Sequence, residues 1–101
     1  MRELTFEEIK EALRLRQGGT ALVYEYQLSH SWFVLRITNP KLAGNFHLIL
    51  GSCDRIEFDI SWGQANIEIE KDGENYLVRD SNHLFVKCGI VLGKYNVPPI
   101  W

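Results

Sequence analysis

The sequence lacks the features that mark membrane and secreted proteins. None of its 101 residues belongs to an apolar run of the roughly 18 to 20 residues that a membrane-spanning helix needs. The first ten residues, MRELTFEEIK, carry three glutamates and no apolar signal-peptide core. The sequence therefore predicts a cytoplasmic protein without a membrane partner.

Cysteine is scarce as well. The two cysteines, Cys53 and Cys88, form no CxxC pair, and without a signal peptide we expect them to be reduced thiols. A single disulfide between them is the open alternative. Free cysteines of this kind are most often small buried apolar residues.

Catalytic and cofactor motifs are missing. The sequence has no GxSxG, no glycine-rich phosphate loop, no HExxH, no EF-hand loop and no dinucleotide fingerprint. Its three histidines, His30, His47 and His83, do not combine with the cysteines in a zinc-ligand spacing. We therefore expect no enzyme activity, no catalytic residues, no metal site and no cofactor.

The charge balance excludes another class of partner. Eleven Lys and Arg stand against 13 Asp and Glu, for a formal charge of −2. A protein that binds nucleic acid by neutralising phosphates needs a basic surface, so no nucleic-acid partner is expected. With 46% hydrophobic and 24% charged residues, the chain has the composition of one globular domain, residues 1–101.

An N-terminal helix is the clearest local prediction. Thr5 and Glu8 have the spacing of a capping box, and Leu4 and Ile9 that of a hydrophobic staple. The glycine pair at 18–19 accepts the left-handed backbone that ends many helices. The predicted helix covers about residues 6–17.

After residue 20 the hydrophobic period changes to two, which indicates strands. Turns are predicted at 29–30, 51–54, 72–73 and 80–83, with a loop at 61–64. In these registers Tyr24 would face Leu35, and Ile69 would face Tyr76. The seven predicted strands are about residues 20–27, 31–38, 46–50, 56–60, 66–70, 75–79 and 84–92.

The predicted fold class is α+β, mostly β: one helix followed by an antiparallel meander of about seven strands. Because one short helix covers only a few strands, the sheet should close into a barrel or fold into two layers. The alternative is an open sheet buried against a second copy, a homodimer. The extended tail at 96–101 would either lie over its own core or dock on that second copy, and the candidate self-association residues are Trp32, Phe85, Ile100 and Trp101.

Acidic residues concentrate in one segment. Residues 54–80 hold eight acids and three bases, a net charge of −5, which leaves +3 for the rest. If Ile67 pairs with Phe58 or Ile60, Glu68 lies opposite another acid, Glu57 or Asp59. One interpretation of these acids is a solvated face that binds nothing. A second is a surface for a basic partner, and a third is a divalent-cation site. The candidate binding residues are Glu57, Asp59, Glu68, Glu70 and Trp62.

The sequence therefore predicts a non-catalytic protein-interaction or regulatory module, of unknown specific role, that presents an acidic sheet face to a basic protein partner. The alternative is a small barrel that binds an apolar or aromatic small molecule in its interior. In that alternative, Trp62 and His83 would lie near opposite mouths of the barrel.

Overall fold

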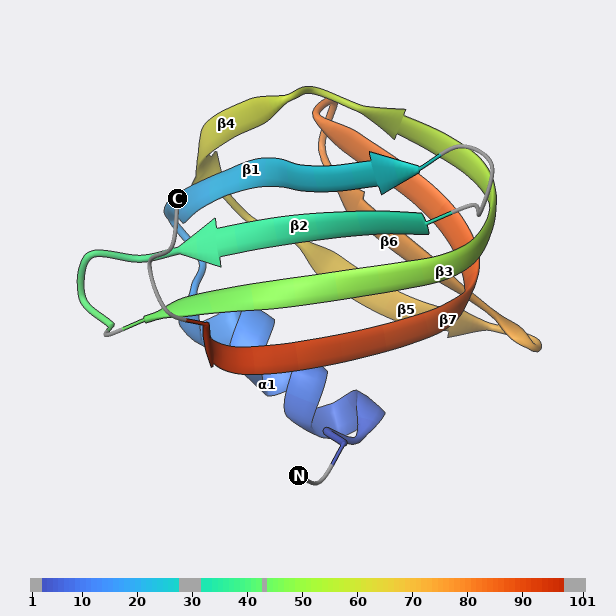
Figure 1. The fold of residues 1–101 in the computed structure, drawn as a ribbon, viewed down its shortest axis with the longest axis horizontal. Helices are drawn as coiled ribbons and strands as arrows, with labels where there is room; N and C mark the ends of the chain where they lie inside the picture. The colour runs from blue at the N-terminus through green and yellow to red at the C-terminus, as the bar shows by residue number, and fades with distance from the viewer. Residues whose placement is uncertain (1–2, 28–31, 43, 98–101) are drawn as a thin grey trace.

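One helix and seven antiparallel strands make up the fold (Figure 1), seen in a computed structural model that describes residues 3–27, 32–42 and 44–97. The sheet order is β4-β1-β2-β3-β7-β6-β5, and the sheet curls strongly into a half-barrel. The predicted fold class, one helix and a mostly β chain, is confirmed. The elements are α1 (Phe6–Leu15), β1 (Gly19–Gln27), β2 (Trp32–Thr38), β3 (Asn45–Phe58), β4 (Ser61–Ala65), β5 (Glu68–Asp72), β6 (Asn75–Asp80) and β7 (Leu84–Val97).

Helix α1 begins at the predicted capping box. The Thr5 hydroxyl accepts the Glu8 amide at 3.2 Å, and the Glu8 carboxylate accepts the Thr5 amide at 2.8 Å. The helix ends at Leu15, two residues earlier than predicted, and Gly18 follows with a φ of 85°. The ten residues of α1, the one helix in the described ranges, are too few to cross a membrane.

A bulge changes the predicted register between β1 and β2. Tyr26 pairs with Phe33 as predicted, but the register shifts between Val23 and Glu25. Val23 rather than Tyr24 therefore lies opposite Leu35, so the predicted pairing of Tyr24 with Leu35 is wrong. Two consecutive residues of a bulged strand oppose one residue of its partner, which sequence alternation alone does not indicate. The predicted turn at 29–30 lies outside the described residues.

Strand β3 runs through the turn predicted at 51–54. Gly51 and Cys53 pair with Ile90 and Cys88 of β7 within one 14-residue strand, so the predicted turn is wrong. Ser52 has a φ of 52°, and the register shifts between Cys53 and Arg55. These two irregularities bend the strand where the sequence has turn-like residues. The bend brings the two halves of the sheet to face each other around the core.

Strand β4 forms where a loop was predicted. Residues Ser61–Ala65 pair with β1 instead of connecting two neighbouring strands, so the loop prediction is wrong. Of the strand predicted at 56–60, Ile56 to Phe58 are the end of β3 and pair with β7, whereas Asp59 and Ile60 follow the strand. Two predicted strands, 46–50 and 56–60, thus belong to the single strand β3, and the predicted loop adds β4. These two errors cancel, so the number of strands still agrees with the prediction.

The hairpin between β5 and β6 is present with a shifted register. Its two turn residues are Gly73 and Glu74, and the φ of 64° at Gly73 suits the first central position of a type II′ turn. Ile69 pairs with Val78 rather than with Tyr76. The shift is two residues, so each side chain keeps its predicted face of the sheet.

Strand β7 is longer than predicted. It extends from Leu84 to Val97 rather than to about residue 92, so the first two residues of the predicted tail belong to it. Residues 98–101 lie outside the described part of the chain. Both halves of β7 are paired with β3, and the first half is also paired with β6.

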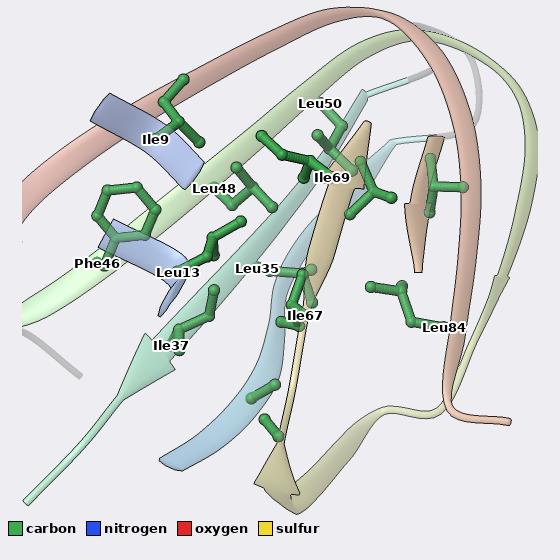
Figure 2. Close-up of a cluster of buried hydrophobic side chains, with 14 of the residues drawn as sticks. Ile9, Leu13, Leu35, Ile37, Phe46, Leu48, Leu50, Ile67, Ile69 and Leu84 are labelled. Carbon is green, nitrogen blue, oxygen red and sulfur yellow. The ribbon is translucent and has the colours of Figure 1, made fainter. Parts of the chain in front are cut away.

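Figure 2 shows how side chains from both halves of the sheet and from α1 meet in one core. Ile9 and Leu13 of the helix point toward Phe46 and Leu48, while β5 contributes Ile69 from the opposite wall. Burial of these apolar side chains is the main contribution to the stability of the fold. The large side chains that are less than 2% exposed include Phe33, Phe46, Ile9, Leu35, Leu48, Leu50, Leu84, Val78 and Val86.

One carboxylate holds the two ends of the sheet together. Strands β4 and β5 are its edges and do not pair with each other. Asp80, at the end of β6 and 4% exposed, accepts a hydrogen bond from Trp62 Nε1 of β4 at 2.7 Å. It also accepts the Asn66 amide, in the corner between the edges, at 2.8 Å. A buried carboxylate with two donors is a strong anchor, because hydrogen bonds to a charged group are stronger than those between neutral groups.

Replacing this anchor should destabilise the protein. We expect Asp80→Ala to lower the free energy of unfolding by about 3 kcal/mol, since hydrogen bonds to a charged group are lost and two donors are left without an acceptor. Asp80→Asn retains one oxygen and should cost less. Urea denaturation gives both values. The exposed Asp72→Ala is the control, with an expected change within about 0.5 kcal/mol. A loss in Asp80→Ala no larger than in this control would contradict the anchor role.

Candidate functional site

The predicted acidic strip is divided between two parts of the molecule. Glu57 lies on β3 and Asp59 directly after it, whereas Glu68 and Glu70 lie on β5. In the sheet order, β7 and β6 separate these strands. The predicted pairing of like charges is therefore wrong: Glu57 lies opposite Phe85, and Glu68 lies opposite a basic residue, Arg79. The physical reason is β4, which leaves β3 to pair with β1.

Basic side chains neutralise part of this outer face. Arg55 pairs with Glu57 at 2.7 Å, and Arg79 pairs with Glu70 at 3.1 Å. All four side chains are about half exposed or more, so each pair adds little to stability. The outer face thus has alternating charges rather than a continuous acidic strip.

A groove of about 470 Å³ separates α1 from β5. Its helical wall is a polar stripe with members three, four and seven residues after Glu7, a spacing that places them on one side of the helix, and it continues to Gln17 just past the helix end. The sequence analysis did not connect this stripe with β5. The stripe consists of Glu7, Lys10, Glu11, Arg14 and Gln17.

The strand wall of the groove is the edge of β5. Three consecutive residues of the strand line it, Glu68, Ile69 and Glu70, together with Ile67, which directly precedes the strand. Because successive side chains of a strand point to opposite faces, a hollow lined by consecutive residues runs along the strand's edge. Strand β5 is the last strand of the sheet and pairs only with β6. Among the described residues no strand pairs with its other edge, which leaves the outer row of main-chain N–H and C=O groups of β5 without a strand partner.

Carboxylates dominate the groove. Four of its lining side chains are acidic and two, Lys10 and Arg14, are basic. Arg14 is already hydrogen-bonded to Glu11 at 2.7 Å, and this contact lowers the pKa of the Glu11 carboxyl. Neither Glu7 nor Glu68 forms an ion pair with a side chain in the described ranges. The groove thus has negative charge available on both walls.

The other predicted binding residues lie around a smaller hollow of about 300 Å³, which Glu57 and Asp59 help to line. Asp59 contacts His83 Nδ1 at 2.8 Å. Trp62 is 6% exposed and stacks on His83 at 5.4 Å between ring centroids. The prediction that Trp62 and His83 lie near opposite mouths is therefore wrong. Trp62 closes the end of the half-barrel, and its ring is not an exposed anchor.

The predicted self-association residues do not form one patch among the described residues. Trp32 and Phe85 are partly buried on the outer face, on β2 and β7. The Arg55 guanidinium lies over Phe85 at 5.1 Å. Ile100 and Trp101 lie outside the described residues. Self-association stays a prediction.

A buried histidine lies on the outer face of β3. His47 is 8% exposed, and its Nε2 accepts a hydrogen bond from Arg36 Nε at 3.1 Å. The Tyr24 ring, displaced to this face by the bulge, lies 4.7 Å from the imidazole and 4.3 Å from the guanidinium. Burial lowers the pKa of His47, and the charges of Arg36 and Lys94 lower it further. His47 therefore acts here as a neutral acceptor.

Within the described ranges, no three His, Cys, Asp or Glu side chains gather into a set that could hold a metal ion. No protein-family model matches this sequence, and no curated protein or solved structure matches it. Function is therefore inferred from the groove, the β5 edge and their charges.

The His47 contact should make stability depend on pH. The folded state binds a proton at His47 less tightly than the unfolded state, so protons favour unfolding. We expect the free energy of unfolding to fall as pH decreases below about 6.5, the ordinary value for histidine. His47→Gln, whose amide oxygen still accepts from Arg36, should remove this component.

Urea denaturation between about pH 7.5 and about pH 5.5 measures the effect. An unchanged pH dependence in His47→Gln would contradict the assignment.

Proposed function

We propose that this protein is a non-catalytic protein-interaction module that binds an extended, basic segment of a partner protein as an added strand on β5. The observation that carries the proposal is the groove lined by three consecutive residues of the edge strand β5 and by Ile67 directly before it. Such a groove presents the unpaired main chain of an edge strand. Strand addition to an exposed sheet edge is a general mode of peptide recognition.

The dimensions of the groove fit a short peptide. Strand β5 has five residues and α1 has ten, and both span about 15 to 17 Å at their usual rises per residue. A segment of about five residues in extended conformation therefore matches both walls. Main-chain hydrogen bonds to β5 would supply affinity, and the helix would restrict which side chains fit.

Charge selects the partner. Glu68 on the strand wall and Glu7 on the helix wall offer carboxylates on both sides of the groove. Lys or Arg side chains that alternate along an added strand would reach one wall or the other. The same acids oppose pairing with a second copy of β5, because like charges would meet across the new strand pair. Specificity thus depends on repulsion as well as attraction.

The small-molecule alternative has less support. Interior positions of the half-barrel hold fully buried side chains such as Phe33 of β2, Leu50 of β3 and Val86 of β7. Trp62 and His83, the residues assigned to two mouths, are in contact with each other. The groove rather than the interior is therefore the site that the proposal uses.

The test selects peptides and then changes the groove. The full chain is immobilised, and a phage-displayed library of random peptides is selected against it. We expect peptides with Lys or Arg at alternate positions. Fluorescence anisotropy then compares the natural sequence with the double variant Glu7→Lys, Glu68→Lys. Binding should weaken by about tenfold, since two attractive charge pairs become repulsive.

The matched control, Asp54→Lys with Glu57→Lys, makes the same change in net charge on β3, outside the groove. It should leave the affinity within about twofold of the natural value. Equal weakening in both variants would show a general charge effect and overturn the groove assignment. Failure to select any peptide would overturn strand addition itself.

A further inference from the structure

Two cysteines lie directly opposite each other in the core. Cys53 of β3 and Cys88 of β7 are register partners, where Cys88 is 1% exposed and Cys53 is partly buried. Opposed residues of antiparallel strands have Cα atoms about 4.5 or 5.5 Å apart. A disulfide accepts Cα separations of about 4.4 to 6.8 Å. Either kind of pair is therefore close enough to be joined without moving a strand.

The main chain around this pair is irregular on β3. Ser52, with a φ of 52°, precedes Cys53, and the register shifts directly after it. Gly89 follows Cys88 and lies against Ser52. Opposed Cβ atoms are about 4.5 to 5.5 Å apart, whereas a disulfide needs about 3.5 to 4.5 Å. The bulge supplies the freedom for this small approach, and a bond formed under such strain is easier to reduce.

The two thiols differ in reactivity. A hydrogen bond from the Cys88 thiol lowers the pKa of Cys53, against the opposing effects of burial and the Asp54 carboxylate. The same contact and deeper burial raise the pKa of Cys88. Cys53 is also the more accessible of the two. It is therefore the attacking thiol in an exchange reaction, and Cys88 is the resolving thiol.

We propose that Cys53 and Cys88 form a reversible redox site that a low-molecular-weight disulfide, such as oxidised glutathione, converts to an intramolecular disulfide. The Cys53 thiolate attacks one sulfur of the oxidant, forms a mixed disulfide and releases one glutathione thiolate. That thiolate accepts the Cys88 proton. Cys88 then attacks Cys53 Sγ and releases the second glutathione thiolate, which takes up the proton that Cys53 lost. Two protein thiols are oxidised and one oxidised glutathione is reduced to two thiols. This site is independent of the β5 groove.

The test incubates the full chain with oxidised glutathione and follows intact mass and free thiols. We expect the mass to decrease by two hydrogens, both thiols to disappear, and the protein to remain monomeric on a non-reducing gel. Excess reduced glutathione should restore both thiols. A stable mixed disulfide, a disulfide between two chains or an unreacted protein would each overturn the proposal.

Single variants test the order of attack. Cys88→Ala should stop at a mixed disulfide with one glutathione, because no resolving thiol remains. Cys53→Ala leaves the buried thiol and should react at least about tenfold more slowly than Cys88→Ala. Faster reaction of Cys53→Ala would overturn the assigned order. If a variant fails to fold, as judged by circular dichroism, the experiment on the natural sequence still decides the proposal.

Discussion

The pairing of β3 with β7 is the constraint on which the rest of the structure depends. Both strands have 14 residues, and their shared ladder bends near Ser52 and Gly89. The first half of β3 carries β2, and through it β1 and β4, while the first half of β7 carries β6 and β5. The bend turns these two groups of strands toward each other around one core (Figures 1 and 2). One helix is then enough, because the sheet covers itself.

A sheet that curls without closing keeps two edges, and here the edges differ. Edge β4 is held at its end by Trp62, whose indole donates to Asp80. Edge β5 lies beside α1 and leaves a groove. The same geometry that buries the core therefore leaves one row of main-chain donors and acceptors for a partner. In the proposed binding mode, the partner uses the unpaired edge of β5, which would disappear only if the sheet closed into a barrel.

Local signals in the sequence predicted the elements that depend on local interactions. The capping box at Thr5 and the hairpin near Gly73 are present because each involves residues close in the chain. The run Gly51 to Asp54 has turn composition, yet Gly51 and Cys53 pair with β7, so the run is a bulged part of strand β3. That pairing joins residues far apart in the sequence, which local composition does not reveal.

Only the part of the candidate site that depends on local composition could be predicted. The excess of acids between residues 54 and 80 was visible, and Glu68 and Glu70 do line the groove. Their neighbours were not predictable, since the path of β4 decides which strands are adjacent. The helix stripe that starts at Glu7 carried one available signal: polar residues at helical spacing beside the buried stripe of Ile9 and Leu13.

The central claim is that the edge of β5 receives a partner strand, and amide hydrogen exchange measures this directly. In the free protein, the β5 amides that face the groove should exchange faster than those of β3 and β7. Addition of a selected basic peptide should slow exchange at β5 and leave the outer face of β2 unchanged. Slowed exchange confined to β4 or to the outer face, with β5 unaffected, would contradict the account.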